Sequence, residues 1–317
     1  MTARFAPSVW WRNPHIQTIW PVICKPKLAP ALKRQRLELD DGDFIDLDWL
    51  AQPSPGQPLL LLIHGLEGGA DSHYIRRMLL SAQAHGLATV VMHQRSCSGE
   101  PNRLLRSYHS GASDDLKRVI DHLHLRFGDH PLWALGYSLG ANQLLKYLGE
   151  QRQHSLLARA AAVSPPLDLA ACAKRMERGF SRVYQRHLIK RLQRKTAQKL
   201  KDFPEFSLAK PLSQLNTFYQ FDDAVTAPTN GFAGAADYYQ QASGKPFVAD
   251  IVTPTLLLHA IDDPFMTTAV VPEQISTSVT MELHPRGGHV GFIAGGWPWA
   301  PQFYLEPRLL QFFCAES

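Results

Sequence analysis

A serine between two glycines is the first residue of this sequence whose type and surroundings could support chemistry. Ser138 lies in the segment 136–140, Gly-Tyr-Ser-Leu-Gly, after an apolar run and before an amphipathic run that begins at Asn142. This order predicts a strand, a sharp turn and a helix, which is the context of a nucleophile elbow. The two glycines are expected where strand and helix pack too closely for a Cβ atom. The alternative is an ordinary strand-to-helix connection with a small capping residue at position 138.

Two further residue types complete the set that would activate such a serine. A serine hydroxyl is a weak nucleophile at neutral pH, so it needs a histidine base that a carboxylate orients. Asp263 follows an apolar run over 255–260, and its neighbour Asp262 is the alternative carboxylate. His289 lies in a glycine-rich stretch after the next apolar run, whereas His284 ends that run and is expected to be structural. The order serine, acid, histidine is the one that accompanies a nucleophile elbow.

Negative charge that develops on a substrate carbonyl would need two backbone N–H donors. We expect one from Leu139, the residue after the serine, and the other from Leu66, in the glycine-rich stretch after the apolar run over 58–64. The glycines at 68–69 could instead form a phosphate-binding turn, but no Lys-Ser or Lys-Thr follows at the Walker spacing. The residues therefore predict hydrolysis of an ester through an acyl-enzyme on the serine.

No cofactor and no metal ion are expected. The 14 histidines and the four cysteines, at positions 24, 97, 172 and 314, follow no metal-ligand or disulfide spacing. The cysteines are therefore expected to be reduced thiols, and the protein is expected to be cytoplasmic. The expected binding partner is a small-molecule acyl ester, and the sequence leaves the oligomeric state open.

Apolar runs alternate with amphipathic runs through most of the 317 residues. Strands are expected over 58–64, 87–93, 131–137, 156–164, 254–260 and 278–284, and helices over 72–85, 113–127 and 307–315. This alternation predicts an α/β fold with a mostly parallel central sheet and helices on both faces. The stretch 167–246 has helical periodicity and no clear strand, so we expect an inserted, mainly helical cap. The core then comprises 1–166, with an N-terminal arm, and 247–317.

Three local expectations concern the first half of the chain. Residues 5–23 are rich in Trp and Pro, look too irregular for a long helix, and are expected to pack on the domain as an arm. Residues 35–39 and 44–50 alternate apolar and polar side chains around Asp41-Gly42, which predicts a hairpin. Ser113 is expected to cap the helix that follows it. No apolar run approaches the roughly 20 residues that a membrane span needs, and none resembles a secretory signal.

The net charge of +5 is unevenly distributed. The stretch Lys174–Lys201 holds eleven Lys and Arg residues and a single acidic residue, Glu177, so the rest of the chain is net acidic. The simpler interpretation is a solvated helix face, and the sharper one is weak peripheral contact with anionic lipid. Nucleic acid is not an expected partner, because the sequence contains no recognised nucleic-acid-binding motif.

Several stretches together resemble the YheT-like branch of the α/β-hydrolase superfamily. The resemblance rests on the segments 13–19 (Asn-Pro-His-Ile-Gln-Thr-Ile), 64–68 (His-Gly-Leu-Glu-Gly), 97–102 (Cys-Ser-Gly-Glu-Pro-Asn), 136–140, 262–265 (Asp-Asp-Pro-Phe) and 287–291 (Gly-Gly-His-Val-Gly). It covers nearly the whole chain and implies an α/β-hydrolase fold and an esterase or lipase-like hydrolase. The family's Ser-Asp-His triad then corresponds to Ser138, Asp263 and His289. One departure is Ser96, which stands where relatives have glycine.

The resemblance also bears on the substrate and on the alternatives. Relatives act on acylglycerols, phospholipids or medium-chain ethyl esters, in some cases by acyl transfer to an alcohol, so a lipid-like acyl substrate is expected. Aromatic residues of the segment 221–239 would either pack on the core or line an acyl pocket. Two alternatives remain open. One is an acyltransferase that uses the same acyl-enzyme, and the other is a non-catalytic binding module on the same fold.

Overall fold

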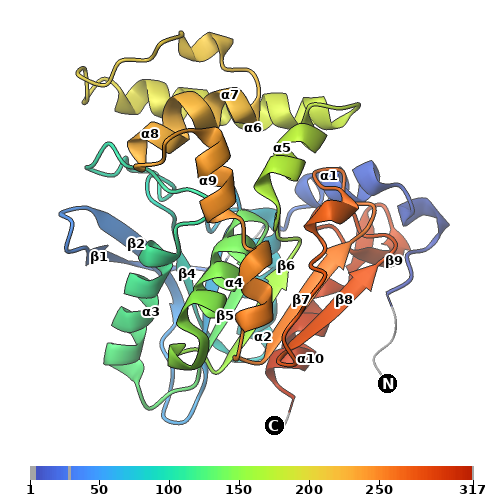
Figure 1. Cartoon of the computed structure of the whole chain (residues 1–317). Coiled ribbons are helices and arrows are strands. Elements are labelled where there is room, and N and C mark those ends of the chain that lie inside the picture. The colour runs from blue at the N-terminus through green and yellow to red at the C-terminus, as the bar shows by residue number, and fades with distance from the viewer. Residues whose placement is uncertain (1–4, 28–29, 316–317) are drawn as a thin grey trace.

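An eight-stranded sheet lies at the centre of the computed structural model, which describes residues 5–27 and 30–315. The strands follow the order β1-β2-β4-β3-β5-β6-β7-β8 across the sheet. In chain order they are β1 (Lys33–Glu38), β2 (Phe44–Ala51), β3 (Leu59–Ile63), β4 (Ala88–Met92), β5 (Leu132–Tyr137), β6 (Arg159–Val163), β7 (Thr255–Ala260) and β8 (Val279–His284). Only β1–β2 and β2–β4 pair antiparallel, and the other neighbours are parallel (Figure 1). The mostly parallel α/β-hydrolase fold is confirmed.

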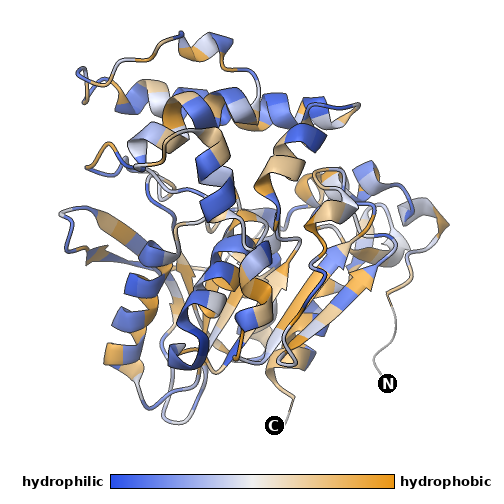
Figure 2. Cartoon of the chain, viewed as in Figure 1, coloured by the Kyte–Doolittle hydropathy of each residue, from blue (hydrophilic) through white to orange (hydrophobic). Residues whose placement is uncertain are grey.

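Helices cover both faces of this sheet (Figure 1). They are α3 (Ser113–Phe127) and α4 (Leu139–Gln151) on one face, and α2 (His73–Ala84) and α10 (Leu305–Phe313) on the other. Successive side chains of a strand point to opposite faces. Accordingly Leu61 of β3 shares a core cluster with Leu144 of α4, whereas Leu62 shares one with Met78 of α2. Figure 2 shows the resulting concentration of hydrophobic residues in the central strands.

The chain between β6 and β7 forms only helical elements, which lie above one end of the sheet (Figure 1). We refer to α5–α9 as the cap helices. They are α5 (Leu169–Met176), α6 (Ser181–Lys199), α7 (Phe218–Phe221), α8 (Ala227–Thr229) and α9 (Ala235–Ala242), with a π-helical segment over Asp222–Thr226. The 3-10 turns of the chain are Val9–Trp11, Arg152–His154, Leu212–Gln214, Lys245–Asp250 and Thr268–Val270. Treatment of 167–246 as a separate domain stays a prediction.

The N-terminal arm is more regular than its sequence suggests. It contains α1 (Pro14–Ile23), so the expectation of an irregular segment is wrong for these ten residues. The reason lies at the start of the helix, where Asn13 Oδ1 accepts hydrogen bonds from the N–H groups of His15 and Ile16 and Pro14 occupies the first turn. An Asn cap followed by Pro is a strong start signal for a helix.

One further expectation needs correction, and one element of the fold had not been predicted. The N-cap of α3 is Ala112, and the side chain of Ser113 instead accepts a hydrogen bond from Lys146 Nζ at 3.2 Å. A second sheet was not predicted at all: β9 (Ile293–Trp297) and β10 (Ala300–Phe303) form a short antiparallel hairpin beside α1. Within residues 5–27 and 30–315, the helices are all too short or too polar to cross a bilayer.

Candidate active site

Ser138 occupies the strained turn that the sequence predicts. It lies between β5 and α4 with φ 51° and ψ −119°, a backbone conformation that non-glycine residues rarely adopt. A Cβ atom on Gly136 would lie 2.5 Å from the carbonyl oxygen of Gly140, and one on Gly140 would lie 2.6 Å from the carbonyl oxygens of Ile63 and His64. The two glycines are therefore needed because the strand and the helix approach each other closely.

His289 and Asp263 converge on this serine from two other loops. His289 Nε2 lies 2.9 Å from Ser138 Oγ, and His289 Nδ1 lies 2.8 Å from Asp263 Oδ2. With the proton of the imidazole on Nδ1 donated to the carboxylate, Nε2 is free to accept the serine proton. The imidazole ring also stacks on Phe265, with ring centroids 4.1 Å apart and an interplanar angle of 9°. The three residues that the sequence singled out thus form one continuous relay of hydrogen bonds.

The two alternative residues lie nearby but outside the relay. Asp262 accepts a hydrogen bond from the Gly288 N–H at 2.9 Å, so it shapes the histidine loop from below, and burial raises its pKa. His284 is buried between the rings of Phe5, Phe292 and Tyr304. Both positions are consistent with structural roles.

The N-terminal helix α1 supports the loop that carries His289. The spacing of residues along the sequence could not predict this support. Thr18 Oγ1 accepts a hydrogen bond from the His289 N–H at 3.0 Å. Gln17 is fully buried and bridges to the backbone of Ile293, accepting from its N–H at 2.7 Å and donating to its carbonyl oxygen at 2.9 Å. A Cβ atom on Gly291 would lie 2.1 Å from the Gln17 carbonyl oxygen. The motif 13–19 therefore has a physical role: it holds the loop that carries His289.

The backbone around Leu66 also lies against the serine. A Cβ atom on Gly65 would be 3.1 Å from Ser138 Cβ, and the N–H groups of Gly65 and Glu67 donate to the hydroxyls of Tyr74 and Tyr108. Within residues 5–27 and 30–315, no protein acceptor lies within hydrogen-bonding geometry of the Leu66 N–H. Leu139 is the first residue of α4, where an N–H has no intrahelical acceptor. Both expected donors thus lie beside Ser138 with their N–H groups available.

The basic stretch at 174–201 is only partly a solvated helix face. Three of its side chains turn inward onto the core: Lys195 Nζ donates to Glu67 Oε1 at 2.6 Å, Arg191 Nη2 donates to the Glu67 carbonyl oxygen at 2.5 Å, and Lys199 Nζ donates to Asn102 Oδ1 at 2.9 Å. Burial lowers the pKa of Lys199 to about 7. Arg191 and Lys195 thereby attach helix α6 to the loop that contains Leu66. No local sequence pattern predicts these contacts, because they join residues far apart in the chain.

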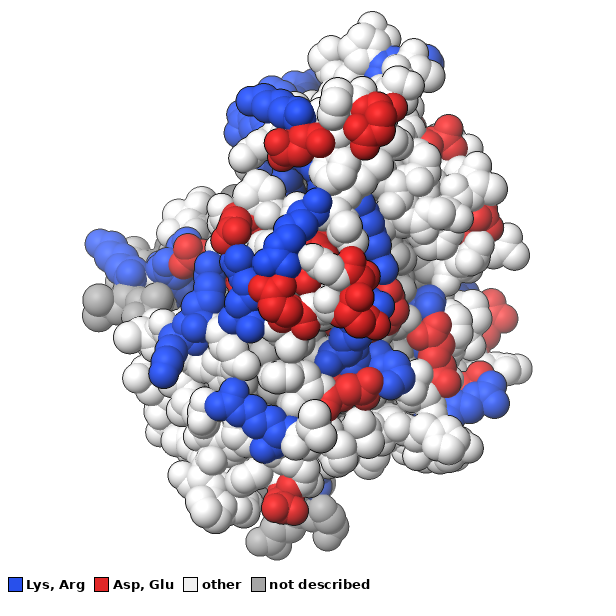
Figure 3. Space-filling view, turned by 90° about the vertical axis from the view of Figure 1, so that its left-hand side faces the viewer, with Lys and Arg blue, Asp and Glu red and all other residues white. Residues whose placement is uncertain are grey.

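The loop with the Ser96 departure keeps a glycine-like backbone. Ser96 has φ 61°, and its hydroxyl donates to Asn102 Oδ1 and accepts from the Asn102 N–H. The adjacent Arg95 is buried and paired with Asp43 and Asp115. Figure 3 shows that Lys and Arg side chains are interleaved with Asp and Glu side chains on the face that carries the β1–β2 hairpin. For Ser96, the hydrogen bonds of its hydroxyl with Asn102 compensate for the strain of its left-handed backbone conformation.

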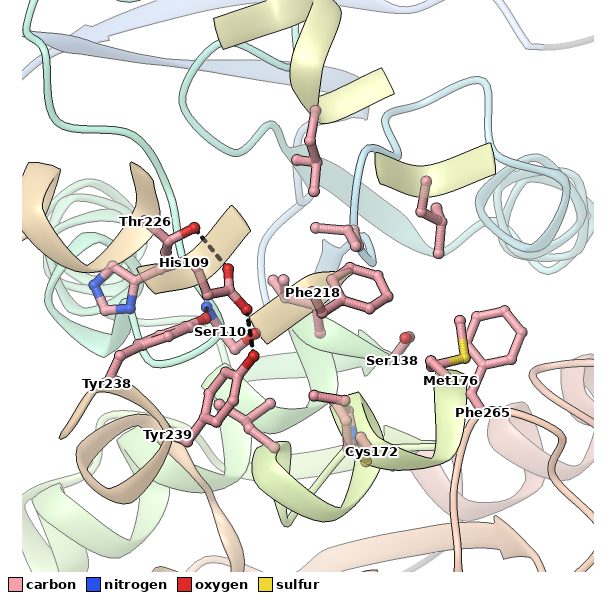
Figure 4. Close-up of a pocket in the computed structure, with 18 of the residues that line it drawn as sticks. His109, Ser110, Ser138, Cys172, Met176, Phe218, Thr226, Tyr238, Tyr239 and Phe265 are labelled. Carbon is pink, nitrogen blue, oxygen red and sulfur yellow. Dashed lines mark hydrogen bonds between the residues drawn. The ribbon is translucent and has the colours of Figure 1, made fainter. Parts of the chain in front are cut away.

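A cavity of about 130 Å³ extends from Ser138 beneath the cap helices. Its walls are mostly apolar and include Cys172, Met176 and Phe218. Figure 4 shows Met176 and Phe265 on one side of the serine, and Tyr239 and Thr226 at the far end on the other side. That far end is polar: Tyr239 and Thr226 donate hydrogen bonds to the two carboxylate oxygens of Asp222, at 2.8 and 2.7 Å. Burial raises the pKa of Asp222 to about 6.

A second, larger space also reaches Ser138. This groove of about 1060 Å³ lies between α1, the loop 65–74 and the first half of α6. Charged and histidine side chains are frequent in its walls, among them Lys25, Asp71, His73 and Arg191. Ser138, His289 and Leu66 line both spaces. Among the described residues, no cluster of three or more His, Cys, Asp or Glu side chains could hold a metal ion.

Comparison with known proteins agrees with the α/β-hydrolase fold. The family model of the alpha/beta hydrolase fold matches residues 58–295. The chain is 43% identical to "Putative esterase YheT" of Escherichia coli, over 97% of this chain and 92% of that protein. The chain belongs to the YheT-like family of α/β hydrolases. It is therefore an esterase- or lipase-type hydrolase.

Two relatives from outside bacteria share less of the sequence. The human protein "Phospholipase ABHD3" is 27% identical over 98% of this chain and 79% of its own length. The yeast protein "Monoacylglycerol lipase" is 31% identical over 81% of this chain and 60% of its own length. Among solved structures, the Pyrococcus furiosus esterase Pf2001 matches with a TM-score of 0.53 and 14% identity, over 84% of this chain and 90% of that one, which supports the fold alone.

Proposed function

We propose that this YheT-like protein is a serine hydrolase that cleaves carboxylic esters of lipid-like or short- to medium-chain acyl groups. The observation that carries the proposal is the relay from Asp263 through His289 to Ser138, at 2.8 and 2.9 Å, at the junction of a cavity and a groove. The names of two relatives, a monoacylglycerol lipase and a phospholipase, support the acyl-ester class of substrate.

The first half of the proposed reaction forms an acyl-enzyme. His289 Nε2 takes the proton of Ser138 as its oxygen attacks the ester carbonyl, and the carbonyl oxygen becomes negatively charged. The N–H groups of Leu66 and Leu139 stabilise this charge. Asp263 stabilises the imidazolium. His289 then gives the proton to the alkoxide oxygen, the C–O bond breaks, and the alcohol leaves.

The second half regenerates the enzyme. A water molecule gives its proton to His289 and attacks the acyl carbonyl, and the carboxylic acid leaves as the proton returns to Ser138. The acyl group would occupy the smaller, more apolar cavity, because burial of a hydrocarbon chain against apolar walls is favourable. The alcohol and the water would use the larger groove. Residues 167–246 would then act as the cap that sets acyl-chain preference.

A series of p-nitrophenyl esters of graded acyl length tests this proposal, with Ser138→Ala as the blank. We expect release of nitrophenol that the blank lacks, and labelling of Ser138 by a fluorophosphonate probe. Absence of both in the wild-type protein would favour a non-catalytic binding module. The same assay with added ethanol separates hydrolysis from acyl transfer, because a transferase would yield ethyl ester in place of free acid.

A further inference from the structure

Exposed apolar side chains gather at one corner of the molecule. Nine of the fifteen large apolar side chains that are exposed in the described part of the chain come from the segments 9–23, 180–183 and 297–299. These nine, which we call the docking face, are Val9, Trp10, Ile16, Val22, Ile23, Phe180, Val183, Trp297 and Trp299. Exposed apolar surface concentrated in this way marks an interaction site rather than chance exposure.

Printed contacts join the three segments into one surface. The indole N–H of Trp20 in α1 donates to the Pro298 carbonyl oxygen at 2.8 Å, which holds the tip of the β9–β10 hairpin on α1. On the other side of α1, the ring of His15 packs on Phe180, with centroids 4.6 Å apart, and its Nδ1 lies 3.1 Å from the Tyr184 hydroxyl. Figure 1 shows α1 beside β9 on the right of the molecule.

The three tryptophans of the docking face are largely exposed to solvent. Trp297 and Trp299 stack on each other, with centroids 5.5 Å apart and an interplanar angle of 5°, yet they are 63% and 78% exposed. Trp10 is 73% exposed. An indole has an apolar body and a polar N–H, so the boundary between lipid headgroups and acyl chains suits it well.

The charge around the docking face is strongly positive. The segments 9–27, 174–191 and 286–304 contain eleven Lys and Arg residues and one acidic residue, Glu177, whereas the rest of the chain is net acidic. A positive surface complements anionic headgroups. It opposes self-association through the same face, because a second copy would bring like charges together.

The docking face borders the groove that leads to Ser138. Val22 of α1 and Val183 of α6 both line this groove, which also contains Ser138 and His289. A bilayer in contact with both valines would therefore lie at the groove's opening. We propose that the docking face binds the surface of a bilayer that contains anionic lipids, with the groove open toward the lipid.

Vesicle binding by the full chain tests this proposal and does not depend on enzymatic activity. Failure of this proposal is therefore distinguishable from failure of the proposed function. The variant replaces Trp10, Trp297 and Trp299 by Ser, and the control replaces Leu125, which is 89% exposed on α3, by Ser. We expect co-sedimentation of wild type with vesicles that contain about 30% phosphatidylglycerol, weakened by salt, and a loss of about ten-fold or more in the triple variant. The control should bind as wild type does.

A charge variant and a catalytic readout complete the test. Replacement of Arg12, Arg178 and Arg182 by Glu should remove binding to anionic vesicles and its dependence on salt. Hydrolysis of a water-soluble p-nitrophenyl ester should be unchanged in both triple variants. The proposal is overturned if wild type ignores anionic vesicles at low salt, or if the tryptophan variant binds them as wild type does. It is equally overturned if the tryptophans instead hold a dimer, which light scattering would reveal as a dimeric wild type and a monomeric variant.

Discussion

The two spaces that meet at Ser138 differ in size and in the charge of their walls. The cavity holds about 130 Å³, and its walls are mostly apolar side chains, many of them from the cap helices. The groove holds about 1060 Å³, and its walls, from core loops, α1 and α6, add charged and histidine side chains to apolar ones. A hydrocarbon chain is favoured in the first, whereas the second also offers partners to hydrated groups. Under the proposed function, the cap selects the acyl group, and the core loops and α1 select the alcohol.

The largest effect is expected at Ser138, which lines both spaces. Ser138→Ala should lower kcat by about 10⁶, the scale seen when a catalytic serine is removed. Esters that differ in acyl chain and esters that differ in alcohol should lose activity alike, since each reaction passes through the same oxygen. Initial rates with thermal melting as a check of folding provide the measurement. A rate within ten-fold of wild type for either series would show that the spaces do not share one nucleophile.

The next effect separates the two neighbouring aspartates. Asp263→Asn should lower kcat by about 10⁴, because the amide favours the wrong tautomer of His289. Asp262→Asn is the matched control: its amide oxygen can still accept from the Gly288 N–H, so kcat should change only a few-fold. The reverse ranking in rates on one p-nitrophenyl ester would assign the orienting carboxylate to Asp262.

The polar end of the cavity should reveal itself in the pH dependence of stability. Because the folded-state pKa of Asp222 is raised to about 6 from 3.8, the folded protein holds this proton more tightly than the unfolded chain. Its stabilising effect is complete below the unfolded pKa and is lost as pH rises to about 6, a change of about 3 kcal/mol. Wild type should therefore lose about 2 kcal/mol of this stabilisation between pH 4 and pH 7, whereas Asp222→Asn should not, so the variant gains that much relative to wild type. Urea unfolding at both values measures it, and parallel pH curves would contradict it.

The smallest effect sharpens the assignment of the acyl group. Ala173 is a buried wall residue of the cavity, and Val183 is a half-exposed wall residue of the groove. Ala173→Phe should lower kcat/KM for an octanoyl ester by about ten-fold relative to an acetyl ester, since added volume in a packed site is poorly tolerated. Val183→Phe should leave that ratio unchanged. If the groove variant changes the ratio instead, the acyl group occupies the groove.

Local signals in the sequence were enough to predict the fold and to single out the three residues that the structure brings together. The elbow around Ser138 is specified by glycines two residues away, and each parallel strand by its own apolar run. What supports the site depends on contacts between distant residues, which spacing cannot reveal. Thr18 meets His289 across 271 positions, and Lys195 meets Glu67 across 128. The proposed docking face was not predictable either, because the sequence does not reveal that Trp10, Trp297 and Trp299 are exposed.

Trapping of the acyl-enzyme tests the central claim most directly. The protein is mixed briefly with p-nitrophenyl octanoate, quenched in acid, digested and analysed by mass spectrometry. We predict a single octanoyl adduct on Ser138 in wild type, and none in Ser138→Ala. Turnover without any adduct at Ser138, or an adduct on another side chain, would contradict the role assigned to the elbow and to the two spaces around it.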